Sequence, residues 1–247
     1  MFRLSEPEAA FRLSPVRLMA THELVLEQIE TAINLGRFRP GDRLPSERDL
    51  ADMLHVSRTT VREAIAVLEA RGVVEVRRGR TGGLIVREVH LSPPELRRLL
   101  RANRDQLRDI FDYRVAVESA AAGLAAERRT AQDLRLMRKL SATLNALVDT
   151  HDSEQAAATF AQFQDVDSQF HLVIARAARS SRLARSILKA RAAMFLPVGA
   201  VFAGLEPTAN ELHEQIVEAI EAKDAELAST LMAEHINGTR ATVEAWL

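Results

Sequence analysis

Four side chains in the second half of the chain have the types and the spacing expected of a metal centre. Asp167 and His171 are four residues apart, so on one helix their side chains share a face. His213 lies ten residues before position 223 and His235 eleven after position 224, where we expect the last two helices to be connected. In an antiparallel helix pair, each histidine would lie about 15 Å along its helix from the turn, so the two imidazoles would face one another. One carboxylate and three imidazoles suit a divalent ion, zinc first and nickel or manganese next, and leave positions open for a further ligand.

The same four residues allow a simpler interpretation as structural side chains. A helical histidine is more often a core or surface residue than a metal ligand, and a carboxylate four residues from a histidine is often an ordinary surface pair. The spacing alone leaves both possibilities open. The other histidines follow no such pattern, and we expect them on the surface: His22, His55, His90 and His151.

A second group of side chains, in the first third of the chain, is suited to binding DNA. After Ser57, which can cap a helix, the apolar residues recur at i, i+3, i+4 and i+7 and bury one helix face. The opposite face presents Arg58, Thr59, Thr60 and Arg62 near the start of that helix. Arginine and hydroxyl groups at a helix N-terminus are what a recognition helix offers to the major groove.

A basic β-hairpin is predicted directly after this helix. A β-branched run at 73–76 is followed by Arg-Arg-Gly-Arg at 77–80 and by Gly-Gly-Leu-Ile-Val at 82–86. A glycine-flanked basic tip of this kind can lie along the phosphate backbone as a wing. Either element alone is common on solvated surfaces, but in this order, between residues 45 and 83, the two predict DNA binding.

Helices must position nearly all of these residues. We predict a first helix at 22–35 and then a short helix capped by Ser46, with Asp49 completing a variant of the capping box. Beyond the proline pair at 93–94, no stretch alternates as a strand would. This half is therefore predicted to be an all-α antiparallel bundle of six or seven helices, with segments 94–103, 106–129, 131–149, 153–178, 181–195, 208–222 and 225–246.

Composition limits the possible classes of protein. The 247 residues leave room for a second domain beside a DNA-binding domain of roughly 70 residues. The net charge is −1, but residues 37–87 hold eleven arginines against seven acidic residues, a net of +4, whereas residues 91–247 hold 19 basic and 21 acidic ones. There is no cysteine, which excludes disulfides and thiolate metal sites. Since no apolar run could span a membrane and residues 1–20 lack a secretory signal, we expect a soluble cytoplasmic protein with no membrane partner.

The segment at 45–83 closely resembles the winged helix-turn-helix domain of GntR-type transcriptional regulators. The shared features are a proline-glycine turn, the Pro-Ser-Glu-Arg helix start at 45–48, the Ser-Arg-Thr-Thr-Val-Arg-Glu-Ala helix at 57–64 and an Arg-Gly-Arg wing. The resemblance implies that double-stranded operator DNA is contacted by Arg48, Arg58, Thr59, Thr60, Arg62, Arg78, Gly79 and Arg80, to which we add the helix cap Ser57.

Residues 106–246 resemble the FCD ligand-binding domain of the FadR subfamily of these regulators. The motifs that carry the resemblance are Asp-Tyr-Arg at 112–114, Asp-Ser-Gln-Phe-His at 167–171, Leu-His-Glu-Gln-Ile at 212–216 and Met-Ala-Glu-His at 232–235. The resemblance implies that Asp167, His171, His213 and His235 are metal ligands, since none of the four is missing. The resulting organisation is a flexible arm at 1–20, a winged helix-turn-helix at 21–89, a linker at 90–94 and an all-helical effector domain at 95–247.

Arg114 is the candidate for holding an effector. On an amphipathic helix it would either pair with Glu118, four residues on, or point into a cavity and bind a carboxylate through a bidentate contact. The resemblance favours the second possibility.

Together these features predict a metabolite-responsive repressor that binds a palindromic operator as a homodimer and is released by a small carboxylic acid at the metal. One alternative is a metalloenzyme that uses the Asp/His₃ centre for hydrolysis or oxygen chemistry. Another is an architectural DNA binder with a structural metal. The sequence offers no obvious general base beside the site, and a DNA-reading domain has no purpose in an enzyme, so we favour the regulator.

Overall fold

The computed structural model describes residues 19–79, 82–87, 92–149, 156–194 and 208–247. These residues form ten helices and one two-stranded hairpin, which confirms the predicted mainly α fold. Residues 1–18 of the predicted arm lie outside the described residues, as do positions 90–91 of the predicted linker (His90 among them), Arg80 and His151. The last two linker positions, 93 and 94, belong to the first helix of the bundle.

The N-terminal part, residues 19–87, holds three helices and the hairpin: α1 (Thr21–Asn34), α2 (Glu47–Leu54), α3 (Arg58–Ala70), β1 (Val74–Arg77) and β2 (Gly83–Val86). The predicted caps are confirmed, because Ser46 accepts a hydrogen bond from the Asp49 amide at 3.2 Å and Ser57 accepts one from the Thr60 amide at 3.1 Å. The two strands are antiparallel. The apolar faces of the three helices and the hairpin enclose one hydrophobic core.

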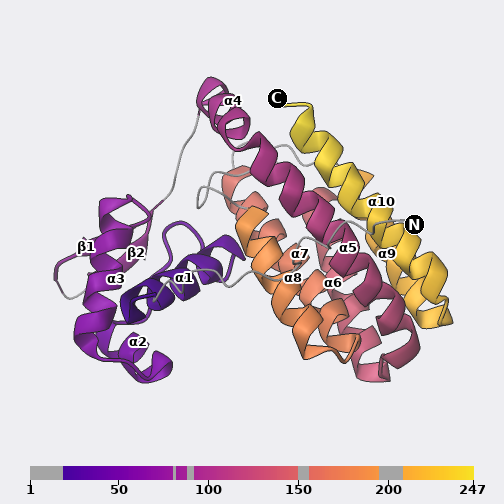
Figure 1. The fold of residues 1–247 in the computed structure, drawn as a ribbon, viewed down its shortest axis with the longest axis horizontal. Helices are drawn as coiled ribbons and strands as arrows, with labels where there is room; N and C mark the ends of the chain where they lie inside the picture. Colours follow the sequence, from indigo (N-terminus) through magenta and orange to yellow (C-terminus); the bar gives the residue numbers. More distant parts are fainter. Residues whose placement is uncertain (1–18, 80–81, 88–91, 150–155, 195–207) are drawn as a thin grey trace, which may run out of the picture.

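The helical bundle, residues 92–247, contains the seven remaining helices: α4 (Pro93–Ala102), α5 (Arg104–Arg128), α6 (Ala131–Asp149), α7 (Ala156–Ala177), α8 (Ser181–Met194), α9 (Thr208–Ala222) and α10 (Ala225–Glu244). Each begins and ends within three residues of its predicted bounds. The long helix α5 packs against α7, α8, α9 and α10 (Figure 1). The turn between α9 and α10 falls where the sequence predicted, with Lys223 at φ +61° and Asp224 capping α10.

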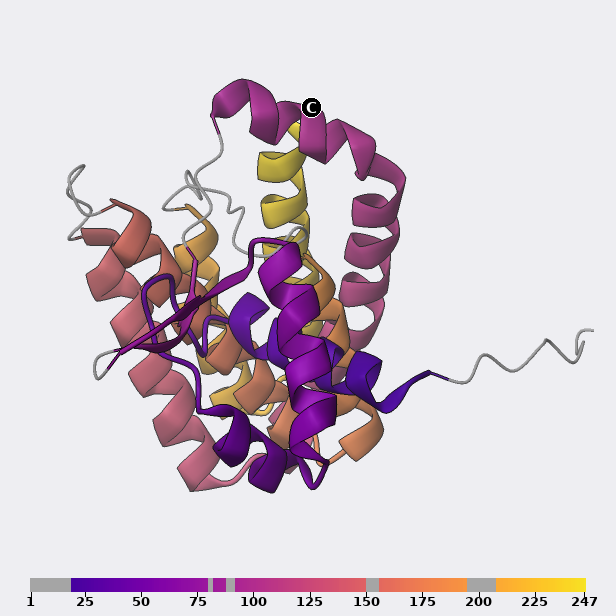
Figure 2. The ribbon, with the colours of Figure 1, turned by 90° about the vertical axis from the view of Figure 1, so that its left-hand side faces the viewer.

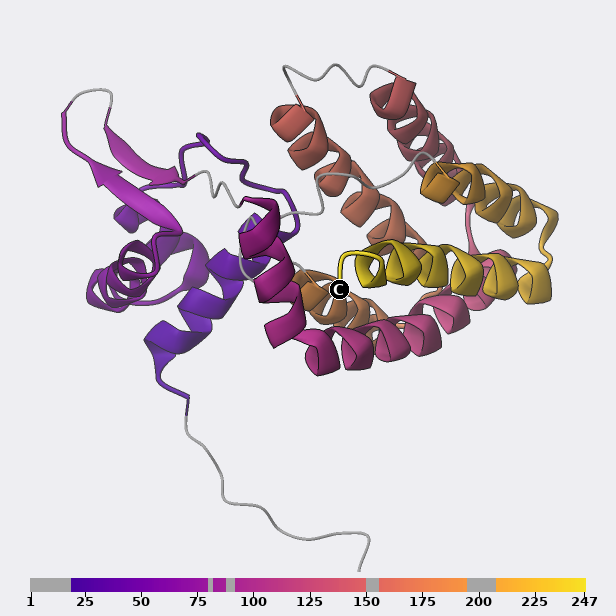
Figure 3. The same ribbon diagram turned by 90° about the horizontal axis from the view of Figure 1, so that it is seen from above.

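The two parts are joined by more than the chain connection. Helix α1 lies between α3 and α8, and contacts both (Figure 1, Figure 2). Viewed from above, α3 and the hairpin lie on the side of the N-terminal part that faces away from the bundle (Figure 3). In the described part of the chain, the length and hydropathy of the helices rule out a membrane-spanning one.

Candidate functional site

The predicted DNA-binding residues form an exposed surface on α3 and the hairpin. Ser57, Arg58 and Thr59 are exposed at the start of α3, and Arg78 and Gly79 are exposed at the hairpin tip. Among the described residues, Arg58 has no ion-pair partner, so its guanidinium is available to a ligand. These side chains have the exposure that contact with DNA requires.

Two further arginines of this surface are engaged within the N-terminal part. Arg62 on α3 pairs with Glu47 on α2, with Nη2 3.1 Å from Oε2. Arg48 lies 3.9 Å from Asp52, four residues on in α2. The Arg62 pair links the two helices of the helix-turn-helix, so this side chain orients α3 as well as facing outward.

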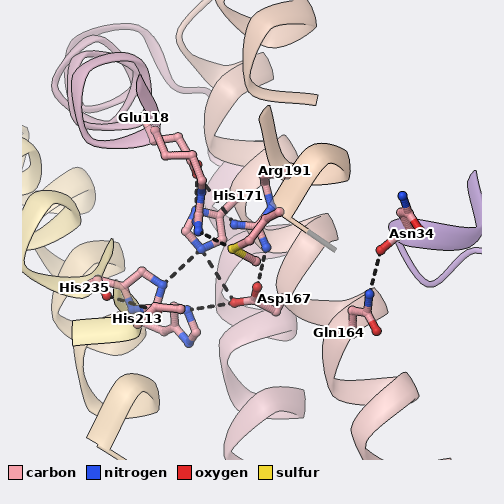
Figure 4. A network of polar contacts seen from close by, with 11 residues as sticks. Asn34, Glu118, Gln164, Asp167, His171, Arg191, His213 and His235 are labelled. Atoms are coloured by element: carbon pink, nitrogen blue, oxygen red, sulfur yellow. Dashed lines mark hydrogen bonds and ion pairs between the residues drawn. The ribbon is translucent and has the colours of Figure 1, made fainter. Parts of the chain in front are cut away.

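The four predicted metal ligands meet in the interior of the bundle (Figure 4). Asp167 and His171 come from α7, His213 from α9 and His235 from α10. The Nε2 atoms of His171 and His235 are 3.1 Å apart. The Asp167 Oδ1 atom lies 3.3 Å from His213 Nε2 and 3.6 Å from His171 Nε2. One donor atom from each residue therefore lies within 4.8 Å of the other three.

These separations fit a single bound ion. Metal–ligand bonds of about 2.0–2.1 Å in tetrahedral or octahedral geometry place neighbouring donor atoms roughly 2.8–3.4 Å apart. Three of the six separations, 3.1, 3.3 and 3.6 Å, are close to that range, and all six are within 4.8 Å. The donor set, one carboxylate oxygen and three imidazole nitrogens, is suited to a divalent transition metal.

Glu118 on α5 orients one of the ligands. Its Oε2 lies 2.6 Å from Nδ1 of His171, a contact that favours a proton on that nitrogen facing the carboxylate. The Nε2 lone pair of His171 is thereby directed at Asp167 and His235. A carboxylate behind a ligating histidine in this way fixes the tautomer and strengthens the ligand.

The protonation states also favour metal binding. Burial lowers the pKa of His213, although Asp167 partly opposes that shift. Burial, reinforced by the neighbouring His213 and His171, lowers the pKa of His235 well below its ordinary value. Burial alone would raise the pKa of Asp167, but Arg191 and His171 outweigh it and hold that pKa well below its usual range. At neutral pH the site thus offers two neutral imidazoles and one ionised carboxylate.

Arg191 on α8 is a functional residue that sequence reasoning missed. It is fully buried, its Nη2 pairs with Oδ2 of Asp167, and its Nη1 lies 3.7 Å from Oε2 of Glu118. The signal was present in the sequence, because Arg191 shares one helix face with the apolar residues Ile187 and Met194. A charged residue within an apolar stripe needs a buried partner.

Arg114 is only 1% exposed and lies beside the same cluster. Its Nε donates to Oε1 of Glu118 at 2.6 Å, and its Nη1 lies 2.8 Å from the sulfur of Met194. The pairing with Glu118, the alternative to effector binding, is thus present. Contact with an effector stays a prediction.

The other described histidines lie apart from this cluster. His55 is exposed in the turn after α2, as predicted. His22, expected on the surface, is half-buried and lies 3.7 Å from Glu63.

Known proteins match the chain in both of its parts. Residues 21–82 match the family described as bacterial regulatory proteins, gntR family, and residues 109–238 match the FCD domain. The chain is 34% identical to a candidate HTH-type transcriptional regulator, RmpR of Mycobacterium gastri, over 87% of this chain and 77% of that protein. It is 30% identical to the Uxu operon transcriptional regulator of Escherichia coli, over 82% of this chain and 79% of that one.

Among solved structures, the fold is similar to that of Escherichia coli McbR/YncC. The TM-score is 0.54 at 23% identity, covering 92% of this chain and 99% of that chain. At this level of identity the similarity concerns the fold alone.

Proposed function

Because the chain belongs to the GntR family of bacterial regulatory proteins and carries an FCD domain, it is a DNA-binding transcriptional regulator, and we propose that it is a cytoplasmic repressor released from its operator by a small organic acid bound at the Asp/His centre. Its relatives and its matched domains are regulators, so the metalloenzyme alternative is set aside. The observation that carries the proposal is the convergence of four donor atoms inside the domain that regulators of this kind use for effectors.

The residues around the centre are suited to an anionic ligand. Asp167, His171, His213 and His235 would hold the metal, with zinc our first candidate. A bound divalent ion with four protein ligands would keep one or two positions open for carboxylate or hydroxyl oxygens of the acid.

The buried charges next to the centre balance before any ligand enters. Arg114 and Arg191 offset the carboxylates of Glu118 and Asp167. The positive charge of the ion would therefore be uncompensated, which favours an anion over a neutral sugar. Arg114 can bind that anion through its terminal nitrogens while its Nε continues to hold Glu118.

Release from DNA requires the acid to distinguish two conformations. The centre joins α7, α9 and α10, and α5 contributes Glu118 and Arg114. An acid that binds the off-DNA arrangement of these helices more tightly shifts the population towards it, whereas equal affinity for both shifts nothing.

A titration of operator binding with small carboxylic acids tests the proposal. In zinc-loaded protein at fixed salt, at least one acid of the panel should weaken operator binding by about tenfold or more, within the usual range of coupling between two sites. Chelated protein should not respond. An equal response after chelation would contradict metal-anchored release, and the absence of any response to the panel would leave the architectural alternative favoured.

We predict that the protein is a homodimer on a palindromic operator. One winged helix reads only a short half-site, and a two-fold operator mirrors a two-fold protein. Light scattering at micromolar concentration should give twice the mass of the chain, and operator titration should give two chains per site. A monomer bound to DNA at one-to-one stoichiometry would exclude this arrangement.

We predict that Glu118→Gln weakens zinc binding by about tenfold or more, as loss of a carboxylate behind a ligating histidine typically does. The amide keeps the shape of the side chain but removes the charge that holds the proton on Nδ1 of His171. Competition with a zinc-binding dye measures the change. Glu214→Gln is the matched control, because Glu214 follows His213 in the chain but is exposed. Equal loss in both variants would show that Glu118 has no special role.

A further inference from the structure

The end of α1 makes a tight contact with the bundle close to the metal centre. We call this contact the interdomain joint and define it by Asn34 and Gly36 of the N-terminal part and by Gln164, Asp165 and Ala192 of the bundle. Asn34 is only 5% exposed although it lies at the last position of α1. The joint is therefore a packed interface within the chain, distinct from the covalent connection between β2 and α4.

Asn34 is hydrogen-bonded to two helices of the bundle at once. Gln164 on α7 donates from Nε2 to the main-chain oxygen of Asn34 at 2.6 Å (Figure 4). The side-chain Nδ2 of Asn34 donates to the main-chain oxygen of Ala192 on α8 at 3.1 Å. Both acceptors belong to the last turn of a helix, where carbonyl groups have no partner within the helix. Each bond thus caps one helix with a side chain from the other part of the molecule.

The two bundle helices that Asn34 connects are also connected by an ion pair to one of the predicted metal ligands. Gln164 precedes the ligand Asp167 by three residues on α7, a distance of about 4.5 Å along the axis. Ala192 directly follows Arg191 on α8, and Arg191 pairs with Asp167. The pair between Asp167 and Arg191 and the bridge through Asn34 therefore depend on the same spacing of α7 and α8.

The joint leaves little room for adjustment. Gly36 has φ +74°, and a β-carbon there would lie 2.8 Å from the backbone of Asp165 on α7. Two ion pairs flank this contact, with Arg39 3.9 Å from Asp165 and Lys189 on α8 3.2 Å from Glu27 on α1. A shift of α7 at Asp165 cannot be absorbed locally and must displace the end of α1.

We propose that the interdomain joint relays occupancy of the Asp/His centre to the DNA-binding part, with Asn34 and Gln164 as positioning residues. The inference rests on the proposed function, since it concerns how occupancy of that site affects the DNA-binding part. Because Asp167 also pairs with Arg191 on α8, an ion that held Asp167 against the histidines of α9 and α10 would restrict the position of α7 relative to α8. Asn34 keeps both of its hydrogen bonds at only one such position, so α1, and the α3 helix packed on it, follow.

Hydrogen exchange on the full chain, with Zn²⁺ alone as the probe, tests the relay. The amides of Leu35, Gly36 and Arg37 bond to carbonyls of α1 and report on the stability of its last turn. Zinc should slow their exchange by about fivefold or more in the unaltered protein, the lower end of typical coupling between sites.

Two variants should break the relay without touching a ligand. Gly36→Ala inserts a methyl group against α7, and Gln164→Met removes the hydrogen bond to Asn34 without straining the backbone. In both, the slowing by zinc should fall below about twofold while zinc affinity stays within about threefold. The matched control is Gly41→Ala, because Gly41 has a similar φ of +87° but a β-carbon there would meet no atom within 4 Å. It should keep the full response.

The outcomes separate the relay from the centre itself. If zinc binds to the unaltered protein and leaves the α1 amides unchanged, or if both variants respond fully, the relay is wrong and the metal centre stands. If zinc does not bind at all, the assignment of the metal centre is wrong, and the proposed relay is refuted as well.

Discussion

Replacing His213 and His235 together by alanine should remove the metal and abolish release of the protein from its operator by the acid. The two residues supply two of the four donor atoms, from two different helices, so no alternative pair can compensate. Zinc per chain, measured by elemental analysis, should fall from about one to near zero, since two protein ligands rarely hold the ion. Either single substitution should lower the metal content in the same direction.

Operator binding itself should survive in these variants, because the N-terminal part has its own hydrophobic core. His22→Ala is the matched control for metal content, since His22 is half-buried but lies outside the cluster. Full zinc occupancy in the double variant would refute the site. An acid response that persists in a double variant shown to be metal-free would refute the mechanism.

Replacing Arg58 by alanine should weaken operator binding by at least about tenfold. This is the loss expected when one good contact to a base or to a backbone phosphate is removed. Arg58 is exposed at the start of α3 and has no ion-pair partner in the described part of the chain. Arg62→Ala should weaken binding to a similar extent, partly because it also breaks the pair with Glu47 that links α2 and α3. Gel-shift titrations at fixed salt measure both effects.

The control for these arginines is Arg185→Ala, which removes an exposed arginine from α8 on the bundle. It separates loss of a specific contact from a general loss of positive charge. Unchanged operator affinity for both Arg58→Ala and Arg62→Ala would contradict the assignment of α3 as the recognition helix. A loss with Arg62→Ala alone would mean that α3 must be oriented correctly but does not read the operator through Arg58.

Short-range patterns in the sequence were sufficient for the helices and for part of the site. Caps such as Ser57 on Thr60, and helix bounds throughout the bundle, depend on interactions across three or four residues, which are encoded locally. Asp167 and His171 share a face for the same reason. His213 and His235 could be paired because a short turn at 223–224 joins α9 and α10. The two histidines are nearly the same number of residues from that turn, so they lie at the same height on neighbouring helices.

Only the tertiary structure identified the partners of these ligands. The sequence placed Glu118 beside Arg114 but gave no indication that its second oxygen holds His171, which is 53 residues further along the chain. The bridge through Asn34 likewise joins α1 to helices that no short turn connects to it. Arg191 and Asp167 lie on α8 and α7, which the short turn at 178–180 connects, but whether their side chains meet depends on how the two helices face one another. Such contacts depend on how each helix is rotated about its axis and on the angle at which it crosses its neighbours. Those quantities are decided when the apolar faces pack into one core, by the sum of many small contacts, and no local pattern records them.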